Sequence, residues 1–154
     1  MADGTRAALL DDERAITRTL FDYADRVDRL DVDGVLACFT ADAEFDFGFG
    51  RVFAGADQLR RLYERLDMYR ATSHHVSNVC IDVVGDVARV RSVLYAFHIR
   101  HDGREVHAWG QYADRFTRSD GGWLIHRRAF RASAEKGTEP DQGRSTLYEF
   151  LPRA

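Results

Sequence analysis

The sequence predicts an α+β fold in which helices come first and a curved antiparallel sheet follows. Up to about residue 69, apolar side chains recur mainly at helical spacing. From about residue 72 the spacing changes to two, and turns rich in Gly and Asp separate four extended segments. Such turns form hairpins, so consecutive segments should pair. Helices that cover one face of a bent sheet leave a pocket between the layers, the usual place for a small ligand.

The first helix is expected to begin at Asp11, whose side chain can cap it. Its apolar stripe consists of Ile16, Leu20, Tyr23, Val27 and Leu30. At about 100° per residue, Asp28 lies at the edge of this stripe, whereas most other charged residues lie on the opposite face. Asp28 is therefore the acid of this helix that we expect to point inward.

Two more helices and one strand are expected before the main sheet. A short helix should cover about 33–39, and a longer one about 56–69. Between them, Phe45, Phe47 and Phe49 alternate with Glu44 and Asp46. This alternation predicts a strand that runs into a glycine turn.

Four strands are expected in the second half, at 72–84, 87–101, 104–117 and 123–131. The last should close the sheet. Its Arg127 and Arg128 are expected at the surface, with binding of an acidic substrate as the alternative. From residue 134 we expect a polar linker and then an apolar tail containing Leu147, Tyr148, Phe150 and Leu151. The whole of 1–154 is interpreted as one domain, with a core at about 10–131 and a C-terminal extension at 134–154.

Composition argues against several classes of partner. The net charge is −3 and acids are interspersed with bases, so neither nucleic acid nor an anionic membrane is expected as a partner. No segment has the pattern of a membrane span or a signal peptide. The isolated Cys38 and Cys80 make no disulfide framework, which favours a cytoplasmic protein.

The adjacent His74 and His75 lie in a predicted strand, where neighbours point to opposite faces, so only one can readily face a pocket. Strict alternation places Asn78 on the face of His74, and it places His98 among small residues of the next strand. A β-bulge in either strand would shift the alternation by one residue and move the later residues to the other face. No HExxH or CxxC spacing is present, and we expect no metal site.

Four motifs follow one another in a characteristic order: LFDYADRVDRLD, CFTADAEFDF, SHHVSN and GQYADRFTRSDGGWLIHRR, with a helix between the second and third. This order resembles the SnoaL-like branch of the nuclear transport factor 2-like superfamily over about residues 10–131. That branch includes scytalone dehydratase, bile acid 7α-dehydratase, hexachlorocyclohexane dehydrochlorinase and polyketide cyclases. The resemblance implies a cone-shaped fold, with N-terminal helices packed on a curved sheet that encloses a pocket.

The resemblance also implies a catalytic pair, because the eliminating members join an acid near the end of the first helix to a histidine on a later strand. The matching residues are Asp28 and His74. His74 stands four residues before Asn78, as in the family pattern. A carboxylate beside a histidine holds its tautomer and makes it a better base. Tyr23, or His98 if protonated, could then donate to an oxygen or a departing hydroxyl.

The expected function is a cofactor-free acid–base reaction on a cyclic, hydrophobic small molecule. Dehydration or a related β-elimination comes first, and polyketide-type cyclisation or isomerisation second. A non-catalytic ligand-binding module and an accessory subunit, like the small subunit of ring-hydroxylating dioxygenases, stay as alternatives in which Asp28 and His74 are a structural pair. The resemblance further implies a homodimer or homotrimer formed through the convex face of the sheet. Further candidates for contact with the substrate are Asn78, Trp109, Tyr112 and Phe47.

Overall fold

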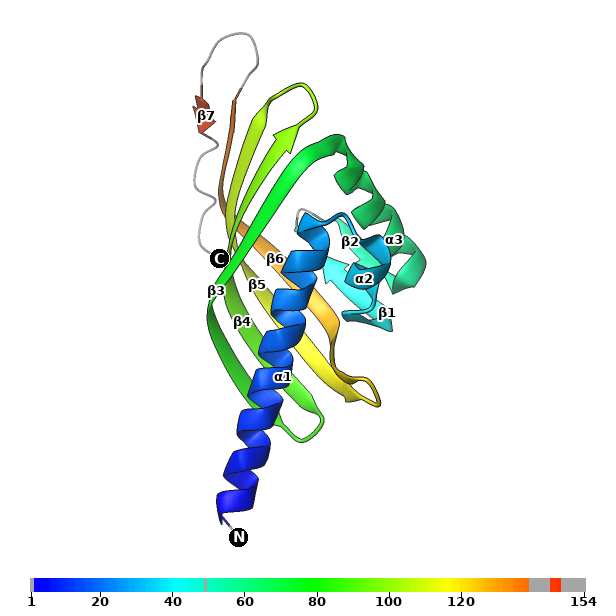
Figure 1. Cartoon of the computed structure of the whole chain (residues 1–154), viewed down its shortest axis with the longest axis vertical. Helices are drawn as coiled ribbons and strands as arrows, with labels where there is room; N and C mark the ends of the chain where they lie inside the picture. Colours follow the sequence, from blue (N-terminus) through cyan, green and yellow to red (C-terminus); the bar gives the residue numbers. More distant parts are fainter. Residues whose placement is uncertain (1, 49, 139–144, 148–154) are drawn as a thin grey trace.

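The computed structural model describes residues 2–48, 50–138 and 145–147, with helices on the concave side of a strongly curved sheet (Figure 1). The helices are α1 (Ala2–Asp28), α2 (Val32–Leu36), α3 (Gly55–Glu64) and the short 3-10 helix η1 (Arg65–Met68). The strands are β1 (Phe39–Asp46), β2 (Val52–Ala54), β3 (Tyr69–Val84), β4 (Val87–Arg100), β5 (Glu105–Ser119), β6 (Gly122–Thr138) and β7 (Ser145–Leu147). The predicted α+β class is confirmed.

The strand order is β2-β1-β6-β5-β4-β3, and β7 also pairs with β6. Strands β3 to β6 pair antiparallel in chain order, as predicted. Two other expectations are wrong. Strand β1 pairs with β6 in parallel, so the sheet is mixed, and β6 lies inside the sheet instead of closing it. The reason is that β1 returns from the helical layer and covers an edge of β6 that would otherwise stay unpaired.

Helix α1 begins at Ala2, well before the expected cap at Asp11, because residues 2–10 contain mostly helix-compatible side chains. Its N-terminal half is held by Asp12, which accepts hydrogen bonds from Arg118 at 2.7 Å and from Trp123 Nε1 at 2.9 Å. At the other end the helix stops at Asp28. Leu30 is not part of the buried stripe, since it has a φ of 57° and is 42% exposed.

Several other boundaries differ from the expected ones. Helix α2 stops at Leu36 because Phe39 already belongs to β1, and α3 gives way to η1 before β3 begins. Strand β6 continues to Thr138, so residues 134–138 extend the sheet and do not belong to a polar linker. Leu147 lies in β7. The predictions for Phe49, Tyr148, Phe150 and Leu151 fall outside the described residues.

The core lies between α1, α3 and the concave face of the sheet, and apolar side chains from all of these layers meet there. Strand β4 shows the alternation clearly, because every second residue from Ala88 to His98 is buried. At one end the core becomes aromatic. There the ring of Tyr23 makes edge contacts with Phe39, Tyr63 and Tyr112. This aromatic end forms part of the wall of a cavity.

Candidate active site

Asp28, the last residue of α1, binds His74 of β3 twice. Its Oδ1 accepts a hydrogen bond from His74 Nδ1 at 2.8 Å, and its Oδ2 accepts one from the His74 backbone N–H at 2.9 Å. The His74 side chain is only 8% exposed. The Nδ1–H group is directed at the carboxylate. The other ring nitrogen, Nε2, has no hydrogen-bond partner among the described residues. Nε2 is therefore the nitrogen available to a ligand.

The neighbouring His75 points the other way. Its ring is exposed, and its Nε2 forms a hydrogen bond with Ser73 Oγ at 3.1 Å. The ring also packs against Tyr95. The alternation of a strand therefore sends one of the two adjacent histidines to the helical side and the other to the convex face.

Thr72 connects the pair to a second histidine, and sequence reasoning missed it. Its Oγ1 lies 2.9 Å from Nδ1 of His98, 3.3 Å from Nδ1 of His74 and 3.5 Å from Oδ1 of Asp28. Thr72 stands two residues before His74 on one face of β3, so the motif Thr-x-His was the available signal. The hydroxyl can donate to Nδ1 of His98, which leaves Nε2–H of His98 as a neutral donor.

Burial, followed by the neighbouring His74, lowers the pKa of His98 to about 4. His98 is therefore neutral near pH 7, and the expectation that it donates as a protonated imidazolium is corrected. Its ring is held by a stacked contact with Tyr69 at 4.4 Å and an edge contact with His74 at 5.2 Å. Only its neutral N–H could serve as a donor.

The pKa of His98 predicts a pH dependence of stability. Since the folded value is about 4 and the unfolded value 6.5, the unfolded chain binds a proton that the folded protein excludes. This contribution is fully present above pH 6.5 and is lost as pH falls toward 4. We expect His98→Gln to flatten the decline in unfolding free energy across this window, measured by urea titration. The half-exposed His126 gives the control His126→Gln, and equal slopes for all three proteins would contradict a buried neutral His98.

The two histidines line a cavity of about 330 Å³ between the helices and the concave face. Aromatic side chains make much of the wall: Tyr23, Phe45, Phe47, Tyr63, Tyr112 and Phe130. Aliphatic groups from α1, α3, η1 and β4 complete the apolar surface. Its charged lining residues are Arg51, Arg65 and Arg100. A mostly apolar cavity with a few convergent polar groups suits a small hydrophobic ligand.

Three phenol hydroxyls meet at the aromatic wall. Tyr63 donates to the hydroxyl of Tyr23 at 3.2 Å, and the ring of Tyr112 lies edge-on to Tyr23 at 6.1 Å. Burial raises the pKa of Tyr63 and of Tyr112 well above the ordinary value, so both stay protonated at physiological pH. The wall thus offers O–H donors and no negative charge.

Arg128 lies buried behind this wall, and the expectation of a surface position is wrong for it. Its guanidinium is sandwiched 4.1 Å from the ring of Tyr23 and 4.0 Å from the ring of Tyr112. It donates to both carboxylate oxygens of Asp114, at 2.9 and 2.7 Å. Burial opposes the charge, but the Asp114 carboxylate outweighs it and keeps the pKa of Arg128 well above the ordinary value. Alternation along β6 explains the difference, because Arg127 takes the exposed face.

Of the four residues predicted to contact substrate, the structure brings Phe47 and Tyr112 to the cavity and leaves Asn78 and Trp109 outside it. Asn78 is exposed and has a φ of 49°, at an irregularity of β3 that breaks the expected alternation. Trp109 is 37% exposed and stacks on His107, because it lies on the convex face of β5. Tyr23 lines the cavity together with both histidines.

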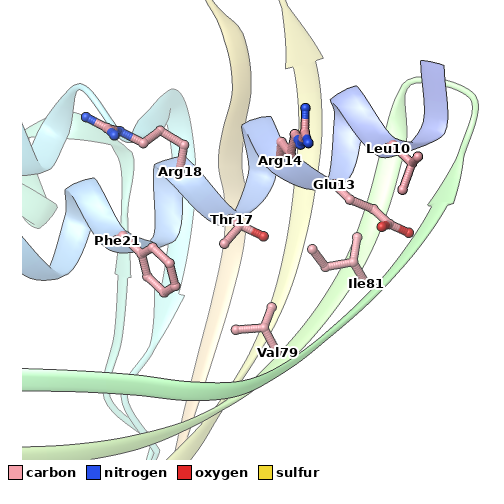
Figure 2. A pocket seen from close by; sticks show the side chains of 8 residues that line it. All are labelled: Leu10, Glu13, Arg14, Thr17, Arg18, Phe21, Val79 and Ile81. Atoms are coloured by element: carbon pink, nitrogen blue, oxygen red, sulfur yellow. The ribbon is translucent and has the colours of Figure 1, made fainter. Parts of the chain in front are cut away.

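A second, wider hollow of about 550 Å³ lies between α1 and β3 (Figure 2). Phe21 and Thr17 of the helix point toward Val79 and Ile81 of the strand. Neither the Asp28–His74 pair nor the tyrosine hydroxyls reach this hollow. It lacks the convergent chemistry of the smaller cavity and is not the candidate active site.

Two kinds of feature are absent from the part of the chain that the structure describes. No group of three or more His, Cys, Asp or Glu side chains is placed to hold a metal ion. None of the described helices is long and apolar enough to cross a membrane.

A protein-family model described as a SnoaL-like domain matches residues 8–129. The chain belongs to the SnoaL-like domain family. The match spans both Asp28 and His74, and it confirms the family that the order of the motifs had indicated. A search of curated protein sequences finds no match for this SnoaL-like protein.

Solved structures support the same family. The SnoaL-like protein is 33% identical to a scytalone-dehydratase candidate from Novosphingobium aromaticivorans, with a TM-score of 0.79 over 88% of this chain and 90% of that chain. It is 26% identical to an aromatic-ring-hydroxylase candidate from the same organism, with a TM-score of 0.77 over 90% and 94% of the two chains.

The dehydrochlorinase LinA shares the fold at lower identity. Two LinA structures are 18% and 16% identical to this chain, with TM-scores of 0.74 and 0.71. The alignments cover 99% of this chain and 100% and 97% of the two LinA chains. Other similar structures are described as cystatin-like or NTF2-like, so the predicted nuclear transport factor 2-like fold is confirmed.

Proposed function

We propose that this SnoaL-like protein is a cofactor-free acid–base enzyme that eliminates water, or another leaving group, from a cyclic hydrophobic small molecule. One observation carries the proposal: His74 is fixed by Asp28 through Nδ1, and its Nε2 has no partner among the described residues while the ring lines an apolar cavity. A histidine held in this way is a general base in the correct tautomer.

In the proposed reaction, Nε2 of His74 removes a proton from a carbon next to a carbonyl or leaving group. Asp28 stabilises the imidazolium that forms, because its carboxylate lies 2.8 Å from Nδ1. The electron pair of the broken C–H bond forms the new double bond, and the leaving group departs from the neighbouring carbon with its own bonding pair. When the leaving group is a hydroxyl, it takes the proton from the His74 imidazolium and departs as water, which returns His74 to its neutral form. The hydroxyl of Tyr23, backed by Tyr63, donates to the substrate oxygen on which negative charge develops.

The similarity to a scytalone-dehydratase candidate supports elimination over the other reactions that one base could perform. The same base would also serve a polyketide-type cyclisation or an isomerisation, which differ only in where the electron pair goes. A binding module or accessory subunit would keep the Asp28–His74 contact as a structural pair, without proton transfer to or from a ligand.

Hydrogen exchange tests the proposal without knowledge of the natural substrate. Wild type is incubated in heavy water with bicyclic ketones such as β-tetralone, and deuterium entering beside the carbonyl is followed by NMR. We expect exchange faster than in buffer alone, and we expect Asp28→Asn to abolish most of the gain. Exchange that is equal in wild type, in Asp28→Asn and in buffer across the ketone panel would favour the binding module.

We also propose that the protein works as a homodimer or homotrimer in the cytoplasm. The convex face carries a cluster of partly exposed rings formed by His75, Tyr95, Phe97, His107 and Trp109. Such a patch favours burial against a second copy. The proposed cytoplasmic location is supported by the two free cysteines of the protein, Cys38 and Cys80, which fit a reducing compartment. Sedimentation equilibrium measures the assembly, and a monomer at micromolar concentration would contradict it.

A further inference from the structure

We infer that the molecule bound in the cavity carries an anionic oxygen group, a carboxylate or a phosphate, which Arg51, Arg65 and Arg100 recognise. The inference rests on the proposed function for the position of the reacting ring, and it adds the chemical class of the ligand. It requires a hydrophobic ring system with a negative charge at one end.

The cavity is charged with one sign only. Arg51 precedes β2, Arg65 belongs to η1 and Arg100 ends β4, so three separate segments each bring an arginine to the lining. No Asp or Glu side chain is among the described lining residues. The whole chain has a net charge of −3, so this concentration of positive charge runs against the average of the molecule. A cavity of one sign attracts ligands of the opposite sign.

These three guanidiniums also have no ion pair with any acid that the structure describes. Elsewhere in the described chain, arginines near acids pair with them, as Arg60 does with Asp33 and Arg131 does with Asp46. Arg51 and Arg65 are exposed and Arg100 is half-buried, whereas Arg91, another arginine without an ion pair, lies on the face of β4 that points away from the cavity. Three such groups that face a shared cavity keep their hydrogen-bond donors for a ligand.

Aromatic rings position two of the guanidiniums. Arg51 lies 5.0 Å over the ring of Phe47, and Arg100 lies 5.7 Å over the ring of Tyr69. Cation–π stacking uses the flat face of a guanidinium and leaves its N–H edge free for a carboxylate or phosphate. Both Phe47 and Tyr69 line the cavity, so the stacked arginines are directed at the same space.

A chain of ring contacts relates Arg100 to the base. Tyr69, beneath Arg100, stacks on His98 at 4.4 Å, and His98 meets His74 at 5.2 Å. An anionic group held at Arg100 would therefore place the rest of the ligand along His98 and His74, with its rings against the aromatic wall. Binding of the charge would orient the reacting carbon toward Nε2 of His74.

Matched probes test the inference by binding alone. Benzoate, naphthoate and anthroate are titrated into wild type by calorimetry, each beside its primary amide, which has the same shape and no charge. Naphthyl phosphate is added to separate the two anions. We expect at least one carboxylate or the phosphate to bind about ten- to a hundredfold more tightly than the amide of the same ring system. This ratio should fall as salt is raised.

The double variant Arg51→Gln/Arg100→Gln should bring the ratio close to one, whereas the matched control Arg91→Gln should keep it. Amides that bind as well as the anions, a ratio unchanged in the double variant, or no anion binding at millimolar concentration would each overturn the inference. Asp28→Asn should keep the charge preference. A protein that prefers anions but exchanges no protons would therefore count against the proposed function alone, and one that exchanges protons but ignores charge would count against this inference alone.

Discussion

Replacing His74 by glutamine is expected to lower the rate of ketone proton exchange by about 10²–10⁴-fold, the range that a general base contributes. The reason is that Nε2 of His74 is the basic atom that the Asp28 contact leaves available at the cavity. Glutamine has a similar reach and hydrogen-bonding groups but cannot take up a proton near pH 7. The rate is followed by deuterium incorporation, and circular dichroism verifies that the variant is folded.

The neighbouring histidine provides an unusually close control. His75 is adjacent in sequence, exposed, and directed to the convex face, so His75→Gln should leave the exchange rate nearly unchanged. If both variants lost activity equally, the effect would come from damage to β3. If neither lost activity, another group would be the base and the assignment of His74 would be wrong.

Replacing Arg128 by methionine is expected to lower the free energy of unfolding by about 3–5 kcal/mol, because it leaves a buried charge without its partner. Both side chains of the Arg128–Asp114 pair are fully buried, and the two hydrogen bonds between them are lost together. The variant also loses the two cation–π contacts with Tyr23 and Tyr112. Urea unfolding followed by tryptophan fluorescence measures the change.

Two further variants separate the unpaired charge from the lost packing. Arg128→Met combined with Asp114→Leu removes both charges and should recover much of the stability. The adjacent Arg127 forms an exposed pair with Glu44, so Arg127→Gln should cost about 1 kcal/mol or less. A single Arg128→Met variant as stable as Arg127→Gln would contradict the buried pair.

The pattern of the sequence was sufficient for the residues whose neighbours repeat regularly. The apolar stripe of α1 placed Asp28 at its inner edge, and alternation along β3 separated His74 from His75. The hairpin turns gave the antiparallel order of β3 to β6. These features depend on local periodicity, which a single sequence carries directly.

Other features depend on contacts between distant segments or on local irregularities, which periodicity does not encode. The parallel pairing of β1 with β6 joins residues some eighty positions apart, such as Phe45 and Arg128. The irregularity in β3 moved Asn78 out of the cavity. Arg128 looked like one of two adjacent surface arginines. Alternation turns it inward, but only its partner Asp114 on the neighbouring strand β5 balances its buried charge.

The tautomer of His74 tests the central claim most directly, and long-range proton–nitrogen NMR correlation on isotope-labelled protein measures it. In wild type we expect the neutral form of the ring to carry its proton on Nδ1 and to leave Nε2 bare. Asp28 accepts two N–H groups of His74, whereas asparagine offers a single acceptor oxygen. In Asp28→Asn the amide NH₂ should therefore face Nδ1 and move the ring proton to Nε2. A proton on Nε2 in the wild type, or the same tautomer in both proteins, would contradict the assignment of His74 as a base held by Asp28.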